Sequence, residues 1–506
     1  MNSDGWPRPG ARAILSRGVP ASRGEPPSVL GPDGPIVVAG VGAGFGVSVE
    51  EVRALLGIAL EQAALDPSSL TAIATVASKA REQGLLDLAA GLGIALVTHP
   101  AAALAAVPVP HPSPRADAAV ATPSVAEAAA LLGVPGGPAN QPTMSVELLV
   151  GKTASPRATV AIARHWRPDL DHHGDAELAP GLLDFAVNVS TEPIPPWLAE
   201  PIAVACADLG RYPDARAATA AVAARYRRPA AEVLLTAGAA EAFTLLAQAF
   251  VPGRAAIVHP QFTEPEVALR AAGWQIDRVL LQQADWFALD PDRVPDEARL
   301  VIVGNPTNPT GTLHQAATLL ALRRPGRLVV VDEAFLDSIP GEPESLASYG
   351  DLTGIVVVRS LTKTWGLAGL RVGYLLGDAA AVAAAAAVQP RWSVSSPALA
   401  AAVACLSDAA QPEVARRAAA VTGWRGQLVD ALAQLGFVVC AQASGPFVLA
   451  RHPRRPGVHA QLRALGIAVR RADTFPGLGP GWIRIAVRDQ ATTRALLDAL
   501  AASAPA

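Results

Sequence analysis

The sequence predicts an α/β protein in which a mainly parallel sheet forms the largest domain. Short apolar runs rich in β-branched residues alternate with helical stretches, which is typical of parallel sheets covered on both faces. Polar or glycine-containing motifs directly follow several of these runs, and the tail beyond about residue 395 changes to a long helix and closely spaced strands. We therefore expect a small N-terminal α/β domain, a large parallel-sheet domain and a small α+β C-terminal domain.

The composition is that of a globular protein and narrows the classes of partner. Of 506 residues, 51% are hydrophobic and 17% are charged, which excludes a disordered chain. The formal net charge is −3 without a basic block, so no nucleic acid is expected. No apolar run is long enough to span a membrane. The cysteines lie far apart and no apolar signal region is evident, so we expect no metal and a cytoplasmic location.

The N-terminal third is predicted to contain one compact domain. Residues 1–34 resemble a disordered leader because Pro and Gly recur every few positions. An α/β domain then covers residues 35–163 and begins with a strand at 35–39 and a glycine turn at 40–46. Ser48 and Glu51 form a capping box that starts a helix. Further strands are expected at 73–76, 94–97, 148–150 and 159–163, and helices at 84–90 and 125–132.

A polar linker over residues 164–174 leads into the larger part of the chain. Residues 175–394 are predicted to form the large domain with an N-terminal arm, and residues 395–506 the small domain. Strands of the large domain are expected at 233–236, 256–259, 300–304, 328–331 and 355–358. Strands of the small domain are expected at 437–439, 447–449, 468–470 and 482–486.

Two motifs after predicted strands are suited to binding an anion and a polar ring. Gly238, Ala239 and Ala240 open a helix, and their free N–H groups can hold a phosphate at its positive end. Asn308 offers a side-chain donor on a turn stiffened by prolines. Active sites of open parallel sheets lie at the carboxyl ends of the strands, which is where both motifs fall.

Two further motifs complete this pattern. Asp332 ends a strand, where its carboxylate can pair with a protonated pyridine nitrogen. Lys363 follows the next strand, three residues after Ser360 and eight before Arg371. A lysine beside an anion-binding cluster is what an enzyme needs to carry pyridoxal phosphate as a Schiff base. The sequence therefore predicts a pyridoxal 5'-phosphate site at this edge of the sheet.

With these four motifs in order, residues 172–503 resemble fold-type-I pyridoxal-phosphate enzymes of the class I/II aminotransferase superfamily. The resemblance implies that Lys363 forms the Schiff base and moves protons, that Asp332 pairs with the pyridine nitrogen and that Asn308 bonds the ring hydroxyl. It also implies that the cofactor's phosphate is bound by Ser360, Thr362 and Arg371.

The same resemblance assigns roles to three residues outside the motifs. Phe262 corresponds to the aromatic residue that stacks on the ring, and Arg484 to the arginine that binds the substrate carboxylate as a bidentate pair. Tyr212 corresponds to a tyrosine that reaches the phosphate from a partner subunit, so a homodimer is expected. One departure is Phe335, which stands where related aminotransferases usually have a tyrosine bonded to the ring hydroxyl.

The segment before the large domain resembles the start of threonine-phosphate decarboxylases of cobalamin biosynthesis. On this resemblance His172 lies near the substrate phosphate and Asn188 near the substrate carboxylate. His173 departs from the pattern because it replaces a glycine. Phenylalanine at the position of Phe335 is common among relatives of this kind.

The first domain resembles the C-terminal domain of a corrin-ring hydrolase of cobalamin biosynthesis. The match includes Ala74 to Lys79, Gly84 to Ala89 and Leu148 to Lys152. It implies a corrinoid contact by Lys79, Glu82 and Lys152. Small or apolar residues after Gly42 replace the family's Cys or basic residues, so the sequence does not decide whether this domain catalyses a reaction.

These resemblances predict an enzyme that decarboxylates L-threonine O-3-phosphate to (R)-1-amino-2-propanol O-2-phosphate through Lys363. The alternative enzyme is an aminotransferase acting on histidinol phosphate or a related amino acid, which would use the same cofactor residues. An alternative from another class is a corrinoid-binding scaffold with a vestigial cofactor site. The sequence leaves the bond broken at the substrate's Cα open.

Overall fold

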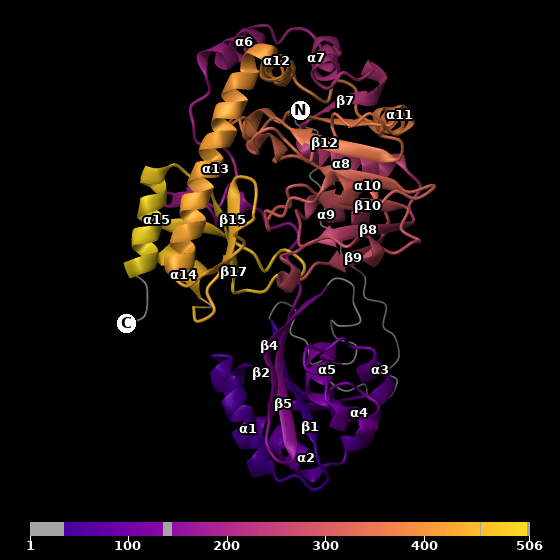
Figure 1. The fold of residues 1–506 in the computed structure, drawn as a ribbon, viewed down its shortest axis with the longest axis vertical. Helices are drawn as coiled ribbons and strands as arrows, with labels where there is room; N and C mark the ends of the chain where they lie inside the picture. Colours follow the sequence, from indigo (N-terminus) through magenta and orange to yellow (C-terminus); the bar gives the residue numbers. More distant parts are fainter. Residues whose placement is uncertain (1–34, 135–143, 456, 503–506) are drawn as a thin grey trace, which may run out of the picture. The chain divides into compact units, whose positions relative to one another are not determined.

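The computed structural model describes residues 35–134, 144–455 and 457–502 (Figure 1), and the predicted leader at 1–34 lies outside these ranges. The described residues form an α/β fold with three sheets, of five, seven and five strands. Among them no helix combines the length and apolar character needed to cross a membrane.

The first domain is a five-stranded sheet in the order β3-β2-β1-β5-β4. Strands β1, β2 and β3 are parallel, and β5 runs antiparallel to both β1 and β4. The strands are β1 (Ile36–Ala43), β2 (Leu70–Val76), β3 (Ala95–His99), β4 (Ser145–Ala154) and β5 (Ala158–Trp166). The helices are α1 (Val49–Gln62), α2 (Gln83–Leu92), α3 (Ala101–Ala105), α4 (Pro114–Val120) and α5 (Val125–Leu132).

The predicted glycine turn at 40–46 is partly wrong, because β1 continues through Gly40 and Gly42 to Ala43. The glycine at 40 serves close packing against α5. A Cβ atom there would lie 1.9 Å from the backbone oxygen of Ala126, so only glycine lets the helix approach the strand. The predicted capping box is present in part, since Ser48 accepts from the Glu51 N–H at the start of α1.

The large domain contains the seven-stranded sheet, in the order β7-β13-β12-β11-β10-β8-β9. Strand β13 alone runs antiparallel to its neighbours, β12 and β7, while the other strand pairs are parallel. The strands are β7 (Val233–Thr236), β8 (Arg254–His259), β9 (Gln275–Leu280), β10 (Leu300–Gly304), β11 (Leu328–Asp332), β12 (Ile355–Ser360) and β13 (Gly373–Gly377).

Helices cover both faces of this sheet, as the alternation of its buried side chains shows. Val329 and Val331 of β11 belong to one hydrophobic core, whereas Val330 between them belongs to another. Successive strand residues point to opposite faces, so both faces are buried. The helices of this domain are α6 (Pro196–Ala207), α7 (Arg216–Tyr226), α8 (Gly238–Ala249), α9 (Glu264–Ala271), α10 (Ala316–Leu320), α11 (Ala379–Val388) and α12 (Ser396–Cys405).

The third sheet, in the order β14-β15-β17-β16-β6, forms the small domain. Strand β6 comes from the arm before the large domain and pairs in parallel with β16, so the arm completes the small domain's sheet. The strands are β14 (Val438–Val439), β15 (Phe447–Arg451), β16 (Ile467–Arg471), β17 (Trp482–Ala486) and β6 (Leu183–Phe185). The helices are α13 (Gln411–Gln434, orange in Figure 1), α14 (Val458–Ala464) and α15 (Gln490–Ala502).

The predicted border between the large and small domains at 394/395 stays a prediction. Helix α12 lies beyond it, yet Ala398, Ala401 and Ala402 of this helix belong to the same core as the large sheet. The small domain's own core includes Phe185 of β6 and, from the second half of α13, Leu428, Val429 and Leu432. Helix α13 therefore passes from one domain to the other.

The close approach of α5 to β1 can be tested with one substitution and a matched control. We expect Gly40→Ala to destabilise the first domain by about 1–3 kcal/mol, because its Cβ overlaps backbone atoms. Gly57→Ala, inside α1 where a Cβ meets no atom within 4 Å, should stabilise the same domain by up to about 1 kcal/mol. Native-state hydrogen exchange of the β1 amides measures both. Equal protection in the two variants would contradict the packing argument.

Candidate functional site

The carboxyl ends of four strands bring the predicted cofactor residues together. Gly304, at the end of β10, pairs in register with Asp332, at the end of β11. Strand β12 ends at Ser360, three residues before Lys363. Strand β7 ends directly before the turn that starts α8 at Gly238. Since these strands run in one direction, their following residues meet at one edge of the sheet.

Lys363 is partly shielded from water, and its charge is disfavoured. Burial lowers the pKa of its amine to about 8, and the positive charges of Arg484 and Arg371 act in the same direction. The carboxylates of Asp332 and Asp175 oppose this shift. The Lys363 Nζ lies 5.7 Å from the centre of the Phe335 ring. A larger share of the amine is therefore neutral and nucleophilic near pH 8 than for an exposed lysine.

The pKa of Asp332 is shifted in the opposite direction from that of Lys363, because burial disfavours the charged form of both groups. Burial raises its pKa to about 6, against the influence of the Ala334 N–H, which donates to Asp332 Oδ1 at 3.0 Å, and of the Lys363 charge. A buried carboxylate needs a cationic or proton-bearing partner. The predicted partner, a protonated pyridine nitrogen, meets this requirement.

The predicted phosphate site is built from a helix start and a short loop. Gly238 adopts a left-handed conformation with φ +79°, and a Cβ there would lie 2.5 Å from Arg371 Nη2. The Arg371 guanidinium therefore lies against the first turn of α8. Thr362 and Ser360 are buried, with their hydroxyl oxygens 2.7 Å apart. Two hydroxyls, a guanidinium and the N-terminal N–H groups of α8, from Gly238, Ala239 and Ala240, can together bind a phosphate dianion.

Arg484 and Asn308 are in direct contact. Arg484 Nη1 donates to Asn308 Oδ1 at 2.8 Å, and Nη2 donates to the Ala186 oxygen. Because its oxygen is occupied, the Asn308 amide has its Nδ2 donor left for the predicted ring hydroxyl. The Nε of Arg484 and both amide atoms of buried Asn188 have no hydrogen-bond partner among the described residues. Buried polar groups in this condition indicate that a polar ligand completes the site.

The sequence did not single out two further buried arginines. Arg470 on β16 lies directly opposite Arg484 on β17, and only 2% and 5% of their surfaces are exposed. Burial and the charges of Arg470 and Arg488 lower the pKa of Arg484 well below its usual range. Arg488 has a carboxylate partner in Asp184 at 3.4 Å, whereas no ion pair is found for Arg484 within the described ranges. The site therefore carries an excess of positive charge.

His172 does not reach this arginine pair through its side chain. Its Nε2 lies 2.9 Å from a carboxylate oxygen of Glu177, which also bonds His459 Nε2 at 3.0 Å. Burial acts to raise the pKa of Glu177, but hydrogen bonds from His459, His172 and the Arg471 N–H lower it to about 2. The contact with the arginines runs through the backbone, since Arg470 donates to the His172 oxygen. The role of His172 near a phosphate stays a prediction.

The two predicted aromatic residues lie in different surroundings. The Phe262 ring is half-buried, 5.5 Å from the His173 ring. Tyr212 is 76% exposed and stacks on Trp392 at 4.2 Å with an interplanar angle of 22°. Such exposure suits contact with a second chain.

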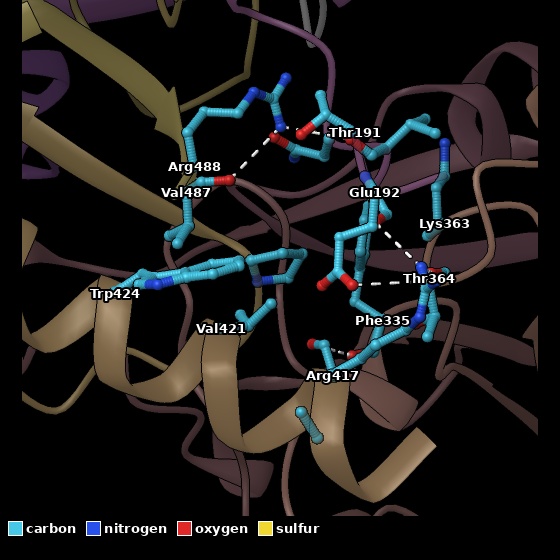
Figure 2. A pocket seen from close by; sticks show the side chains of 16 residues that line it. Thr191, Glu192, Phe335, Lys363, Thr364, Arg417, Val421, Trp424, Val487 and Arg488 are labelled. Atoms are coloured by element: carbon cyan, nitrogen blue, oxygen red, sulfur yellow. Dashed lines mark hydrogen bonds and ion pairs between the residues drawn. The ribbon is translucent and has the colours of Figure 1, made fainter. Parts of the chain in front are cut away.

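A pocket that is partly open to solvent adjoins Lys363 (Figure 2). One wall is α13, which contributes Arg417, Val421 and Trp424, and Phe335 lies nearer the lysine. Arg417 Nη1 donates to the Thr364 oxygen at 3.0 Å, directly after the lysine. The long helix and the lysine loop are thereby held together beside the cavity.

The side chains present fit pyridoxal phosphate: Lys363 as attachment residue, Asp332 as acceptor from the ring nitrogen, Asn308 as donor to the ring oxygen and Arg371 as donor to the phosphate. When bound, this cofactor withdraws electrons from a bond broken at the substrate's Cα. The residues themselves bind and orient the reactants. Lys363, partly neutral near pH 8, is the group able to take and return a proton there.

Comparison with known families identifies the family of each part of the chain. Residues 180–500 match the family model for aminotransferase class I and II, and residues 37–163 match that for cobalamin synthesis G C-terminus. The chain therefore belongs to the class I and II aminotransferase family. It is an enzyme of this family, with pyridoxal phosphate as its cofactor, and carries an N-terminal domain of the second family.

The relatives include enzymes of two activities. A histidinol-phosphate aminotransferase of Mycobacterium tuberculosis is 47% identical over 322 residues, or 63% of this chain and 87% of the relative. A threonine-phosphate decarboxylase of Salmonella typhimurium is 31% identical over 330 residues, which is 63% of this chain and 90% of the relative. Of the two reactions predicted from the sequence, the higher similarity favours amino transfer, the alternative, over decarboxylation.

A solved structure agrees with the fold. The histidinol-phosphate aminotransferase of Clostridium acetobutylicum covers 63% of this chain and 98% of its own, with a TM-score of 0.58 and 24% identity. At this identity the similarity shows the fold alone. The prediction of a fold-type-I architecture is thereby confirmed.

The lowered pKa of Lys363 can be measured because the chain has only three lysines. In the cofactor-free protein, modification of Lys363 by an amine-selective reagent should rise about tenfold per pH unit and level off near pH 8. Asp332→Asn removes a carboxylate that raises this pKa, so the midpoint should move to lower pH. Mass spectrometry of the labelled peptides gives the rates, with Lys79 and Lys152 as internal references. A midpoint near 10.5 would contradict the assigned environment.

Proposed function

We propose that this enzyme acts on a phosphorylated amine or amino acid and that its reaction is amino transfer from histidinol phosphate to a 2-oxo acid. The observation that carries the proposal is the buried pair Arg470 and Arg484, opposite each other on neighbouring strands beside Lys363. Like charges facing each other are unfavourable, and burial increases that cost. Arg470 has Glu177 as a carboxylate partner at 3.8 Å, whereas Arg484 has none within the described residues, so an anionic group of the substrate at Arg484 relieves this cost.

The same residues serve both halves of such a reaction. Histidinol phosphate carries a phosphate where an amino acid carries its carboxylate, so one arginine site can accept the phosphate first and the carboxylate of a 2-oxo acid afterwards. The Nε of Arg484 has no hydrogen-bond partner among the residues that the structure describes, so it is free for this exchange. The 47% identical mycobacterial relative, named for this activity, supports the choice of substrate.

Decarboxylation of threonine phosphate is the second candidate. The domain that matches the cobalamin synthesis G C-terminus model favours it, because a fusion often joins enzymes of one pathway. Phe335, which lies buried next to Phe447, supports it too, through the resemblance noted for this position. This candidate uses the same Lys363, Asp332 and Asn308.

For the first domain we propose a corrinoid contact. Lys79 follows the end of β2, pairs with Glu82 at 3.0 Å and lies 5.7 Å from the exposed ring of Phe45. Glu82 also accepts from the Gly46 N–H, so this carboxylate shapes the loop after β1. Lys152 donates to the His111 oxygen at 3.2 Å. A cation beside an exposed aromatic ring suits a flat ligand with carboxylate groups.

Product analysis distinguishes the two reactions. The purified chain with pyridoxal phosphate should form glutamate from histidinol phosphate and 2-oxoglutarate, and the Lys363→Ala variant should be slower by on the order of a thousandfold or more. Release of CO₂ from threonine phosphate without 2-oxoglutarate would replace the first candidate by the second. If neither product forms, both candidate reactions are overturned, and a corrinoid-binding scaffold is favoured.

We also propose a homodimer in which Tyr212 completes the partner's phosphate site. Tyr212→Ala and Lys363→Ala chains should each be nearly inactive, yet a mixture refolded or exchanged at equal amounts should recover about a quarter of wild-type activity. Half of the dimers are then mixed, and each mixed dimer contains one site with both residues. Tyr212→Ala mixed with itself is the control. Mass spectrometry confirms that mixed dimers have formed. If these dimers recover no activity, Tyr212 acts within its own chain.

A further inference from the structure

Two adjacent histidines, His172 and His173, attach the segment 172–175 to both the small and the large domain. The His172 side chain bonds Glu177, which is held by His459 of α14 and the Arg471 N–H in the small domain. The His173 side chain points elsewhere, and its Nε2 lies 2.8 Å from a carboxylate oxygen of Glu264. Glu264 is the first residue of α9 in the large domain.

This segment lies directly against the catalytic groups. Gly174 follows the histidines, and a Cβ there would lie 2.5 Å from the Ala186 oxygen and 3.3 Å from Arg484 Nη2. The carboxylate of Asp175, the next residue, raises the pKa of Lys363. The position of the segment therefore affects both the arginine and the lysine.

His173 also contacts the residue predicted to stack on the cofactor. Its ring centre lies 5.5 Å from that of Phe262, with the rings tilted by 41°. Phe262 is half-buried and packs against the large sheet's core, so His173 covers part of the ring that the core leaves open. Contacts between rings at this distance are favourable and limit the movement of both rings.

The anchor of His173 is itself firmly placed. The hydrogen bond from His173 lowers the pKa of Glu264, against the effect of burial. A carboxylate in the first turn of a helix is also stabilised by the helix dipole. Glu264 therefore remains ionised and orients the His173 ring toward Phe262, two residues before it.

We propose that His173 is a positioning residue for the cofactor: bonded to Glu264, it fixes the Phe262 ring for stacking. The proposal rests on the proposed role of Phe262 in the cofactor site. Threonine-phosphate decarboxylases that the segment resembles have glycine here, which offers no ring. The contact between the His173 ring and Phe262 is thus a feature of this chain.

Binding of pyridoxal phosphate to the cofactor-free protein tests the proposal without a turnover assay. We expect His173→Gly to raise the dissociation constant about two- to tenfold and to weaken the visible circular dichroism of the bound cofactor. His173→Phe keeps a ring against Phe262 but loses the bond to Glu264, so its dissociation constant should lie between those of wild type and His173→Gly. His173→Gln keeps a hydrogen-bonding group but no ring, and should behave as His173→Gly.

Two controls separate positioning from general stability. His111→Ala removes a similar histidine–glutamate bond, 2.7 Å long, in the first domain and should leave cofactor binding unchanged. Phe262→Ala should weaken binding at least as much as His173→Gly. Wild-type binding by His173→Gly, or equal losses in the Gly and Phe variants, overturns the proposal. Failure of the wild-type chain to bind pyridoxal phosphate would instead refute the cofactor site itself.

Discussion

Buried positive charge from the small domain, close enough to Lys363 to lower its pKa, is the constraint on which this site depends. Arg484 is almost fully buried, faces Arg470 across the sheet and finds no carboxylate partner within the described residues. Its charge helps to lower the pKa of Lys363, and its hydrogen bond sets the orientation of Asn308. Gly174 leaves room beside its guanidinium. The nucleophile, the ring ligand and the covering segment are thus all arranged around one uncompensated cation.

Local sequence signals predicted the framework that places these groups. The bounds of β10 and β17 agree with the prediction because each is a short buried apolar run with clear limits. Asp332 and Lys363 could be assigned from sequence because they follow directly after such runs. The glycine turn failed for a physical reason, since Gly40 serves packing against α5, which no local pattern reveals.

The remaining parts of the site depend on contacts between distant segments. Arg470 becomes a neighbour of Arg484 only through the register of β16 and β17, and a single sequence does not specify that register. Strand β6 joins the small domain although almost 300 residues separate it from β16. The contact of His173 with Phe262 and Glu264 spans about ninety residues and has no periodic signal. Residues that directly follow a buried strand could be predicted from the sequence. Residues that meet only through pairing of distant segments could not.

The arginines also bear on which bond breaks. A carboxylate bound by Arg484 is stabilised as an anion, and losing it as neutral CO₂ would leave the buried guanidinium without a partner. Decarboxylation is therefore opposed while Arg484 holds the carboxylate, and amino transfer is not. A substrate with a phosphate changes this, because the phosphate can occupy the arginines and leave a carboxylate elsewhere. Threonine phosphate has both groups, whereas histidinol phosphate has only the phosphate and can lose no CO₂. In the proposed function, the anion that Arg484 binds thus selects the reaction on one set of cofactor residues.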